Sequence, residues 1–109
     1  MSSFTLSTQD DQVIHDPSPE QVSAVIEGLP PGGDSFVILA DDADEMTFIQ
    51  AMGSPAEGFG LEYQEGSLDQ HFECTSQDLT AEHVVLAFRS YLRGETAWKT
   101  AFTWERMEL

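Results

Sequence analysis

Apolar and polar residues alternate at the start of the chain, which is the pattern of a strand with one buried face. Phe4 and Leu6 fall on the same side of a predicted strand over residues 3–7. Val13 and Ile14 either continue this strand or pair with it around a polar turn. The beginning of the chain therefore predicts β structure.

The next segment predicts a helix, because a capping residue precedes apolar residues at helical spacing. Ser18 can cap the first turn, Pro19 suits the first helical position, and Gln21 can complete a capping box. Gly28 and the Pro-Pro-Gly-Gly run at 30–33 end the helix. Its buried stripe consists of Val22, Val25, Ile26 and Leu29.

Short strands separated by turns are predicted for the middle of the chain. The apolar run at 36–39 is typical of a buried central strand. Turn residues at 41–44 and 53–55 separate it from the strands that follow. The predicted strands span residues 35–40, 45–52, 59–64 and 70–75. Strands joined by such short turns form an antiparallel meander.

A second helix and a last strand complete the pattern. Thr80 can cap this helix, and Gly94 fits just past its end. The apolar face consists of Val84, Val85, Phe88, Tyr91 and Leu92. Residues 102–104 predict the last strand. The order of elements predicts one α+β domain over residues 1–109, with two helices on one face of an antiparallel sheet of five or six strands.

The charge is unusual both in amount and in position. The 109 residues include 20 Asp and Glu but only 4 Lys and Arg, so the formal net charge is −16. The cations are Arg89, Arg93, Lys99 and Arg106, all near the end of the chain. Such a protein repels nucleic acid and anionic membranes, whereas it attracts a basic protein. Acidity that only maintains solubility, or that reflects a salt-rich habitat, is the alternative explanation.

The remaining composition bears on the compartment. A single cysteine, Cys74, excludes an intrachain disulfide. The first residues lack the basic and apolar regions of a secretory signal, and no apolar run reaches the length of a membrane helix. We therefore expect a cytoplasmic protein that is a monomer or a weak homodimer.

Metal and catalytic sites find little support in the residue spacing. Asp42 and Asp44 have the first spacing of a calcium loop, but its fifth and sixth positions are Met46 and Thr47. A closed zinc site needs four ligands, and the only paired spacing among His15, His71, His83 and Cys74 is His71-x-x-Cys74. Neither a nucleophile elbow nor a phosphate-binding loop is present. We expect no metal, no cofactor and no enzymatic activity, unless a pocket brings a histidine and carboxylates together.

The last third of the chain carries a motif. It reads Leu79-Thr80-x-Glu82-x-Val84, Ala87-Phe88-x-x-Tyr91-Leu92-x-Gly94, Trp98 and Phe102-x-Trp104. This motif, with the Pro-capped helix and the strand meander before it, resembles bacterial immunity proteins of the first numbered polymorphic-toxin immunity family. The resemblance implies a protein that blocks a toxin in the producing cell, and several relatives are paired with nucleic-acid deaminases. It implies no catalytic residues, and the matching residues look structural.

The contact surface is predicted from charge. A toxin that acts on DNA or RNA is basic around its active site, so an inhibitor presents carboxylates in place of phosphates. The predicted partner-binding residues are Asp41, Asp42, Asp44, Glu45, Glu57, Glu62 and Glu65. The predicted function is neutralisation of a cognate basic toxin, a deaminase or a nuclease. The alternative is an acidic adaptor or DNA-mimic protein that binds a host nucleic-acid enzyme.

Overall fold

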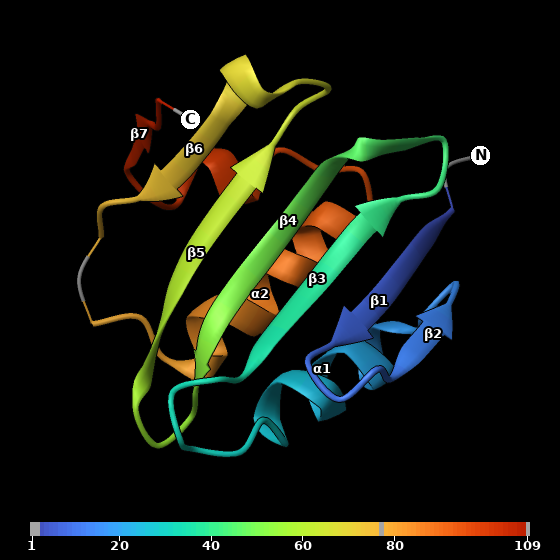
Figure 1. Cartoon of the computed structure of the whole chain (residues 1–109), viewed down its shortest axis with the longest axis vertical. Helices are drawn as coiled ribbons and strands as arrows, with labels where there is room; N and C mark the ends of the chain where they lie inside the picture. The colour runs from blue at the N-terminus through green and yellow to red at the C-terminus, as the bar shows by residue number, and fades with distance from the viewer. Residues whose placement is uncertain (1–2, 77, 109) are drawn as a thin grey trace.

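The computed structural model describes residues 3–76 and 78–108, which form one antiparallel sheet with helices on one side. Figure 1 views the sheet from the side opposite α2, which lies behind β3 and β4. The strands are β1 (Phe4–Thr8), β2 (Val13–His15), β3 (Phe36–Asp41), β4 (Asp44–Ser54), β5 (Gly58–Gln64), β6 (His71–Cys74) and β7 (Trp104–Arg106). The helices are α1 (Pro19–Glu27), the 3-10 turn η1 (Leu68–Gln70), α2 (Ala81–Leu92) and α3 (Ala97–Thr100).

The predicted α+β class is confirmed, but the sheet is larger than predicted. The strands lie in the order β2-β1-β3-β4-β5-β6-β7, which makes seven in the described residues instead of five or six. The difference arises because β2 folds back on β1 as a separate strand. Asp11 allows this tight turn by adopting a left-handed conformation with φ of 63°. Aspartate tolerates that conformation better than most residues do.

Both long helices begin at the predicted caps. The Ser18 side chain accepts a hydrogen bond from the Gln21 backbone, and the Gln21 side chain accepts one from the Ser18 backbone. Thr80 caps α2 in the same way, with His83 as the reciprocal partner. Each cap is worth about 1 kcal/mol. Within the described residues no helix has the length and apolar character needed to cross a membrane.

The core lies between the sheet and the two long helices. Leu6, Leu39, Ile49 and Tyr63 are successive partners across β1, β3, β4 and β5, so they share one face of the sheet. Figure 1 shows α1 and α2 behind this face. The helices contribute Val22 and Ile26 from α1 and Val84 and Phe88 from α2, all fully buried.

The C-terminal aromatic segment folds differently from the prediction. Residues 102 and 103 lie outside any strand, and β7 begins only at Trp104. The short helix α3 was not predicted, and it places Trp98 in the core with 5% exposure. The Trp98 and Trp104 rings each contact the Tyr63 ring edge-on, with centroids 4.7 Å apart. Aromatic packing therefore closes this side of the core.

Gly53 was predicted to lie in a turn, but it lies inside β4 close to the backbone of β5. Its φ is 128°, a value that favours glycine. A Cβ atom at this position would lie 2.0 Å from the carbonyl oxygen of Gly58. Gly60, one residue along the opposite strand, has room, because its Cβ would lie 3.7 Å from the flexible end of Met52. The hairpin of β4 and β5 therefore requires glycine at only one of these two sites.

We expect Gly53→Ala to destabilise the protein by at least about 1–3 kcal/mol, the usual cost of an unfavourable backbone conformation. The clash with the Gly58 carbonyl adds to this cost. Gly60→Ala is the matched control and should change the free energy of unfolding by less than about 1 kcal/mol. Urea unfolding monitored by Trp fluorescence measures both. Equal midpoints for the two variants would contradict the expectation.

Candidate partner-binding surface

Most of the predicted carboxylates gather at one end of the sheet. This hairpin-end cluster consists of Asp41, Asp42, Asp44, Glu45 and Glu65. The first four surround the turn between β3 and β4, and the fifth follows β5 at the same end. The Gly66 backbone donates to the Met46 carbonyl at 3.3 Å, which joins the two loops. The prediction thus selected residues that are neighbours in space.

Local hydrogen bonds position the carboxylates of the cluster. Asp42 accepts from the Thr5 hydroxyl at 2.6 Å, and Asp44 accepts from the Thr47 hydroxyl at 2.9 Å. Asp41 accepts from the Ala43 backbone at 2.9 Å. An amide oxygen could replace the accepting oxygen of Asp41 and Asp42, so their Asn variants remove charge and keep the acceptor. Asp44 accepts with both oxygens, from the Met46 backbone and from the Thr47 hydroxyl, so its Asn variant keeps one of the two.

The negative charge of this cluster affects the pKa of the buried Tyr91 hydroxyl. Burial raises the pKa of Tyr91 far above its usual value, and Asp41, Glu65 and Asp44 raise it further. Carboxylates from two loops therefore act on one core residue. The negative charge of the cluster therefore adds to the effect of burial on the pKa of this one hydroxyl.

Glu65 differs from the rest of the cluster because it already has a cation. The Lys99 ammonium lies 2.7 Å from its carboxylate. The same ammonium lies 5.4 Å from the centre of the Trp98 ring and 5.6 Å from that of Tyr63. This cation–π arrangement holds Lys99 in place. Glu65 therefore contributes less free negative charge than its neighbours.

Glu57 lies at the opposite end of β4 from the cluster. Its carboxylate accepts from the Gly32 backbone at 3.0 Å and from the Ser54 hydroxyl at 3.2 Å. These contacts fasten the loop between α1 and β3 to the turn between β4 and β5. Glu57 thus has a structural role, and it is not part of the same surface as the cluster.

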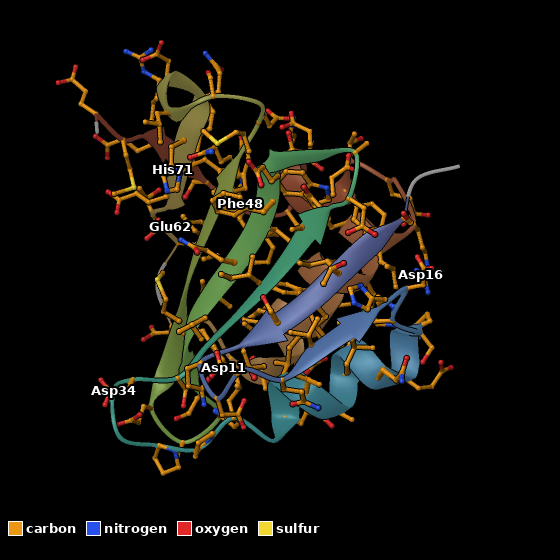
Figure 2. The ribbon with its side chains drawn as sticks, turned by 45° about the vertical axis from the view of Figure 1, so that its right-hand side comes forward. Asp11, Asp16, Asp34, Phe48, Glu62 and His71 are labelled. Carbon is orange, nitrogen blue, oxygen red and sulfur yellow. The ribbon has the colours of Figure 1, made fainter. Side chains whose placement is uncertain are left out.

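Glu62 lies in the middle of the sheet, on the face that points away from α1 and α2. Its carboxylate is 2.6 Å from His71 Nε2 and accepts from the Gln50 amide at 3.1 Å. The other ring nitrogen, Nδ1, is 3.0 Å from Gln64 Oε1, while Gln64 Nε2 donates to the Met46 carbonyl. Both ring nitrogens of His71 are thus engaged by side chains of β5. Figure 2 shows the pair beside Phe48 on the sheet.

The histidines and Cys74 do not come together in the described structure to form a metal site. His71 and Cys74 are three residues apart on one strand, so their side chains point to opposite faces of the sheet. His83 Nδ1 accepts from the Thr80 backbone at the start of α2, and His15 contacts Thr5. Among the described residues no three His, Cys, Asp or Glu are placed to hold a metal ion.

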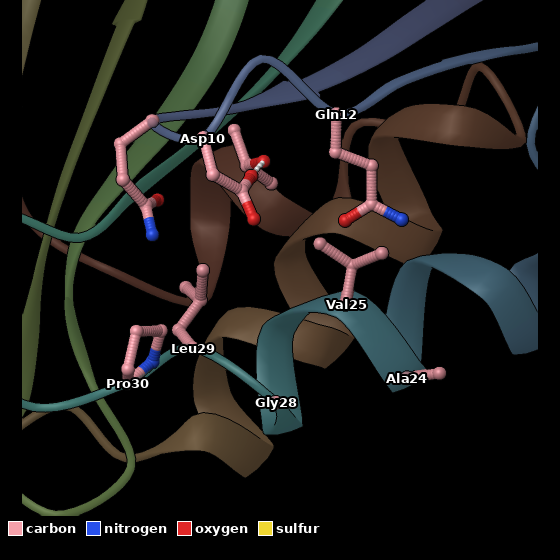
Figure 3. A pocket seen from close by; sticks show the side chains of 9 residues that line it. Asp10, Gln12, Ala24, Val25, Gly28, Leu29 and Pro30 are labelled. Atoms are coloured by element: carbon pink, nitrogen blue, oxygen red, sulfur yellow. Dashed lines mark hydrogen bonds between the residues drawn. The ribbon is translucent and has the colours of Figure 1, made fainter.

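Three grooves lie in the described part of the chain. One, of about 240 Å³, separates the turn between β1 and β2 from α1 and is shown in Figure 3. Its one acidic side chain, Asp10, accepts from the Thr8 hydroxyl, and this hydrogen bond lowers the pKa of Asp10. A second, of about 330 Å³, lies between α2 and α3 and is lined mainly by apolar residues. A third, of about 300 Å³, lies beside η1 and the end of the described chain, where Asp69, Arg106 and Glu108 line it. None of these three grooves brings a histidine together with two carboxylates.

The cations lie on the helix side of the sheet, together with carboxylates such as Glu27 and Glu82. Arg89 lies on α2, Arg93 directly follows that helix and Lys99 lies on α3, and both helices are behind the sheet in the view of Figure 1. Arg106 pairs with Phe72 and so also belongs to the helix side of its strand. On the open face, which points away from the helices, the described strands carry no Lys or Arg. The carboxylates of this face therefore have no Lys or Arg beside them on the described strands of the same face.

Two acidic residues of this surface were not predicted. Glu73 is the partner of Glu62 on β6, and Glu105 is the partner of Glu73 on β7. Directly opposite residues share a face, so the three form a glutamate row across the open face. Strict alternation places Glu73 on the polar side of its strand, but only the register makes the three residues neighbours.

Comparison with known proteins gives no family model, no curated protein and no solved structure that matches this chain. The resemblance to the immunity family therefore rests on the motif at residues 79–104 and on the similar layout of the helix and strands before it. In the fold, Val84, Ala87, Phe88 and Tyr91 of this motif are buried. The motif therefore describes core residues, and it does not describe the acidic surface.

We expect Tyr91→Phe to protect the protein against alkaline unfolding. Because the pKa of Tyr91 is raised in the folded state, the unfolded chain releases this proton first, from about pH 10. The neutral hydroxyl thus contributes stability that is complete below about pH 10 and is lost as the pH rises further. Urea unfolding at pH 8 and pH 10.5 should show that the free energy of unfolding falls less for the variant than for the unmodified protein. An equal decrease for the two proteins would contradict this expectation.

Proposed function

We propose that this chain is a toxin-neutralising immunity protein of the bacterial cytoplasm that binds a basic toxin domain. The observation that carries the proposal is the absence of Lys and Arg from the described strands of the open face, beside the carboxylates of the hairpin end. The cations lie on the helix side, where they are mixed with carboxylates such as Glu82 and Glu95. A surface of one sign favours a partner of the opposite sign and penalises others.

Binding accounts for the site better than catalysis does. The Glu62–His71 pair meets the chemical requirement for acid–base work, but both ring nitrogens of His71 are engaged within the protein. The pair also lies on an open sheet face and lines none of the three grooves. A general base needs a bound substrate within hydrogen-bond reach, which favours an enclosed pocket. The residues therefore support a binding role.

The proposed target class is a toxin that acts on nucleic acid. Such a protein concentrates Lys and Arg where it holds phosphates. Carboxylates held in fixed positions can occupy the same cations and exclude the substrate. Long-range attraction can increase the association rate by about 10–10³-fold, which is an advantage against a lethal partner. The motif at residues 79–104, which resembles the immunity family, supports the same class.

Charge removal at the hairpin end provides the test. The probe is the product of the adjacent gene, which the proposal expects to contain a basic toxin domain. We expect Asp41→Asn, Asp42→Asn and Asp44→Asn together to slow association about tenfold at low salt and to weaken its dependence on salt. The matched control is Glu27→Gln, Asp34→Asn and Glu57→Gln, which removes equal charge at the opposite end. Stopped-flow fluorescence measures both association rates.

Three outcomes are distinguishable in this experiment. Slower association for the hairpin-end variant alone supports the proposal. Equal slowing by both variants indicates that only net charge matters, and it removes the hairpin end from the contact surface. Failure of the toxin domain to bind, together with tight binding of a host nucleic-acid enzyme, favours the acidic adaptor or DNA mimic instead.

A further inference from the structure

The open face of the sheet contains an apolar strip that no described element covers. The strip consists of Phe36, Ile38 and Ala40 on β3 and Phe48 and Met52 on β4. It explains why the run at 36–39 resembles a strand buried on both faces, although helices cover only one. The exposed face of an antiparallel sheet normally carries polar residues. An apolar strip in that position marks a contact surface.

The strip is continuous because of the register. Ile38 is opposite Gln50, Ala40 is opposite Phe48, and Phe36 is opposite Met52. Met52 is 36% exposed, and the other members are half-buried by their neighbours on the sheet. A partner side chain that covers them gains apolar contact without any rearrangement of the backbone.

The glutamate row borders the strip on one side. Neighbouring strands are about 4.8 Å apart, and like charges directly opposite one another destabilise a sheet. His71 contacts Glu62, but within the described residues Glu73 and Glu105 form no ion pair. Both are exposed. The free protein thus retains a repulsion that cations from outside would relieve.

The side chains between the apolar strip and the glutamate row are held in place by their neighbours before any partner binds. The Phe48 ring packs edge-on against the His71 ring, with centroids 6.1 Å apart. His71 in turn contacts Glu62 and Gln64. Side chains held in this way lose little freedom on binding, so the entropy cost of the contact is small.

On this basis we infer that the open face is the central docking surface for the basic toxin, and this inference rests on the proposed function. The occupant is a toxin segment with an apolar side chain that covers Ile38 and Met52. Flanking Arg or Lys side chains contact Glu73 and Glu105. The hairpin-end cluster then increases the rate of association with the toxin, whereas contacts with the open face slow dissociation of the complex.

A second copy of this chain is a poor occupant of the same face. Each copy has a formal net charge of −16. The open face carries Glu62, Glu73 and Glu105 but no Lys or Arg on its described strands, so two such faces would repel one another. The charge that excludes self-association is complementary to a basic partner.

Two pairs of substitutions test the inference with the adjacent toxin domain as the probe. Ile38→Thr with Met52→Thr removes apolar surface and keeps residues that suit strands, and Glu73→Gln with Glu105→Gln removes charge. We expect each pair to weaken binding at least about tenfold, mainly through faster dissociation for the Thr pair. The controls are Leu86→Gln, an exposed apolar residue of α2, and Glu27→Gln on α1. Isothermal titration and surface plasmon resonance measure the affinities and rates.

The isolated protein supplies a second measurement. Because the row is repulsive, Glu73→Gln with Glu105→Gln should raise the urea midpoint while it weakens toxin binding. Loss of binding with a lowered midpoint would instead indicate damage to the fold, and it would contradict the inference for these residues.

The outcomes separate this inference from the proposed function. If the toxin binds and neither pair weakens it, the open face is not the docking surface, although the proposed function stands. If Leu86→Gln weakens binding and the pairs do not, the groove between α2 and α3 is the contact site. If the chain self-associates through the strip in sedimentation experiments, a second copy is the occupant. If the toxin does not bind at all, the proposed function itself fails.

Discussion

The packing of the sheet against α1 and α2 is the constraint on which the rest of the structure depends. The row Leu6, Leu39, Ile49 and Tyr63 must face the helices, because it supplies much of the buried apolar surface. A slip of one residue in any strand would turn that strand's side chains to the opposite face. The core therefore also determines the open face. The same register that buries Tyr63 places Glu62 beside Glu73 on the other side.

The acidic residues serve several purposes, so the net charge does not describe one function. Asp11 and Asp16 adopt positive φ angles around β2, where they make turns possible. Glu57 fastens a loop, and Glu65 forms an ion pair with Lys99. What remains is a smaller set with exposed carboxylates and no ion pair in the described residues, of which Glu73 is an example. Such carboxylates also lie on α1 and α2, as Glu27 and Glu82 do, and the proposed contact involves only those of the open face and the hairpin end.

Under the proposed function, the helix side of the sheet stabilises the fold and the open side contacts the partner. The helix side contains the motif at residues 79–104, the aromatic cluster around Trp98 and the cations. Its residues maintain the fold, so the motif carries no information about a partner. The open side contributes little to the core, and its residues can therefore adapt to a particular partner without loss of the scaffold. A resemblance based on the motif and a docking surface on the open face are thus compatible.

Local chemistry determined much of the secondary structure, and the sequence alone predicted it correctly. The caps at Ser18 and Thr80 and the helical spacing behind them depend on residues a few positions apart. The hairpin-end cluster was predictable for the same reason, because most of its carboxylates surround a single turn. The glutamate row, the Glu62–His71 pair and the requirement for glycine at position 53 were not predictable. Alternation along a strand reveals which residues share a face, but only the order and register of the strands decide which of them become neighbours.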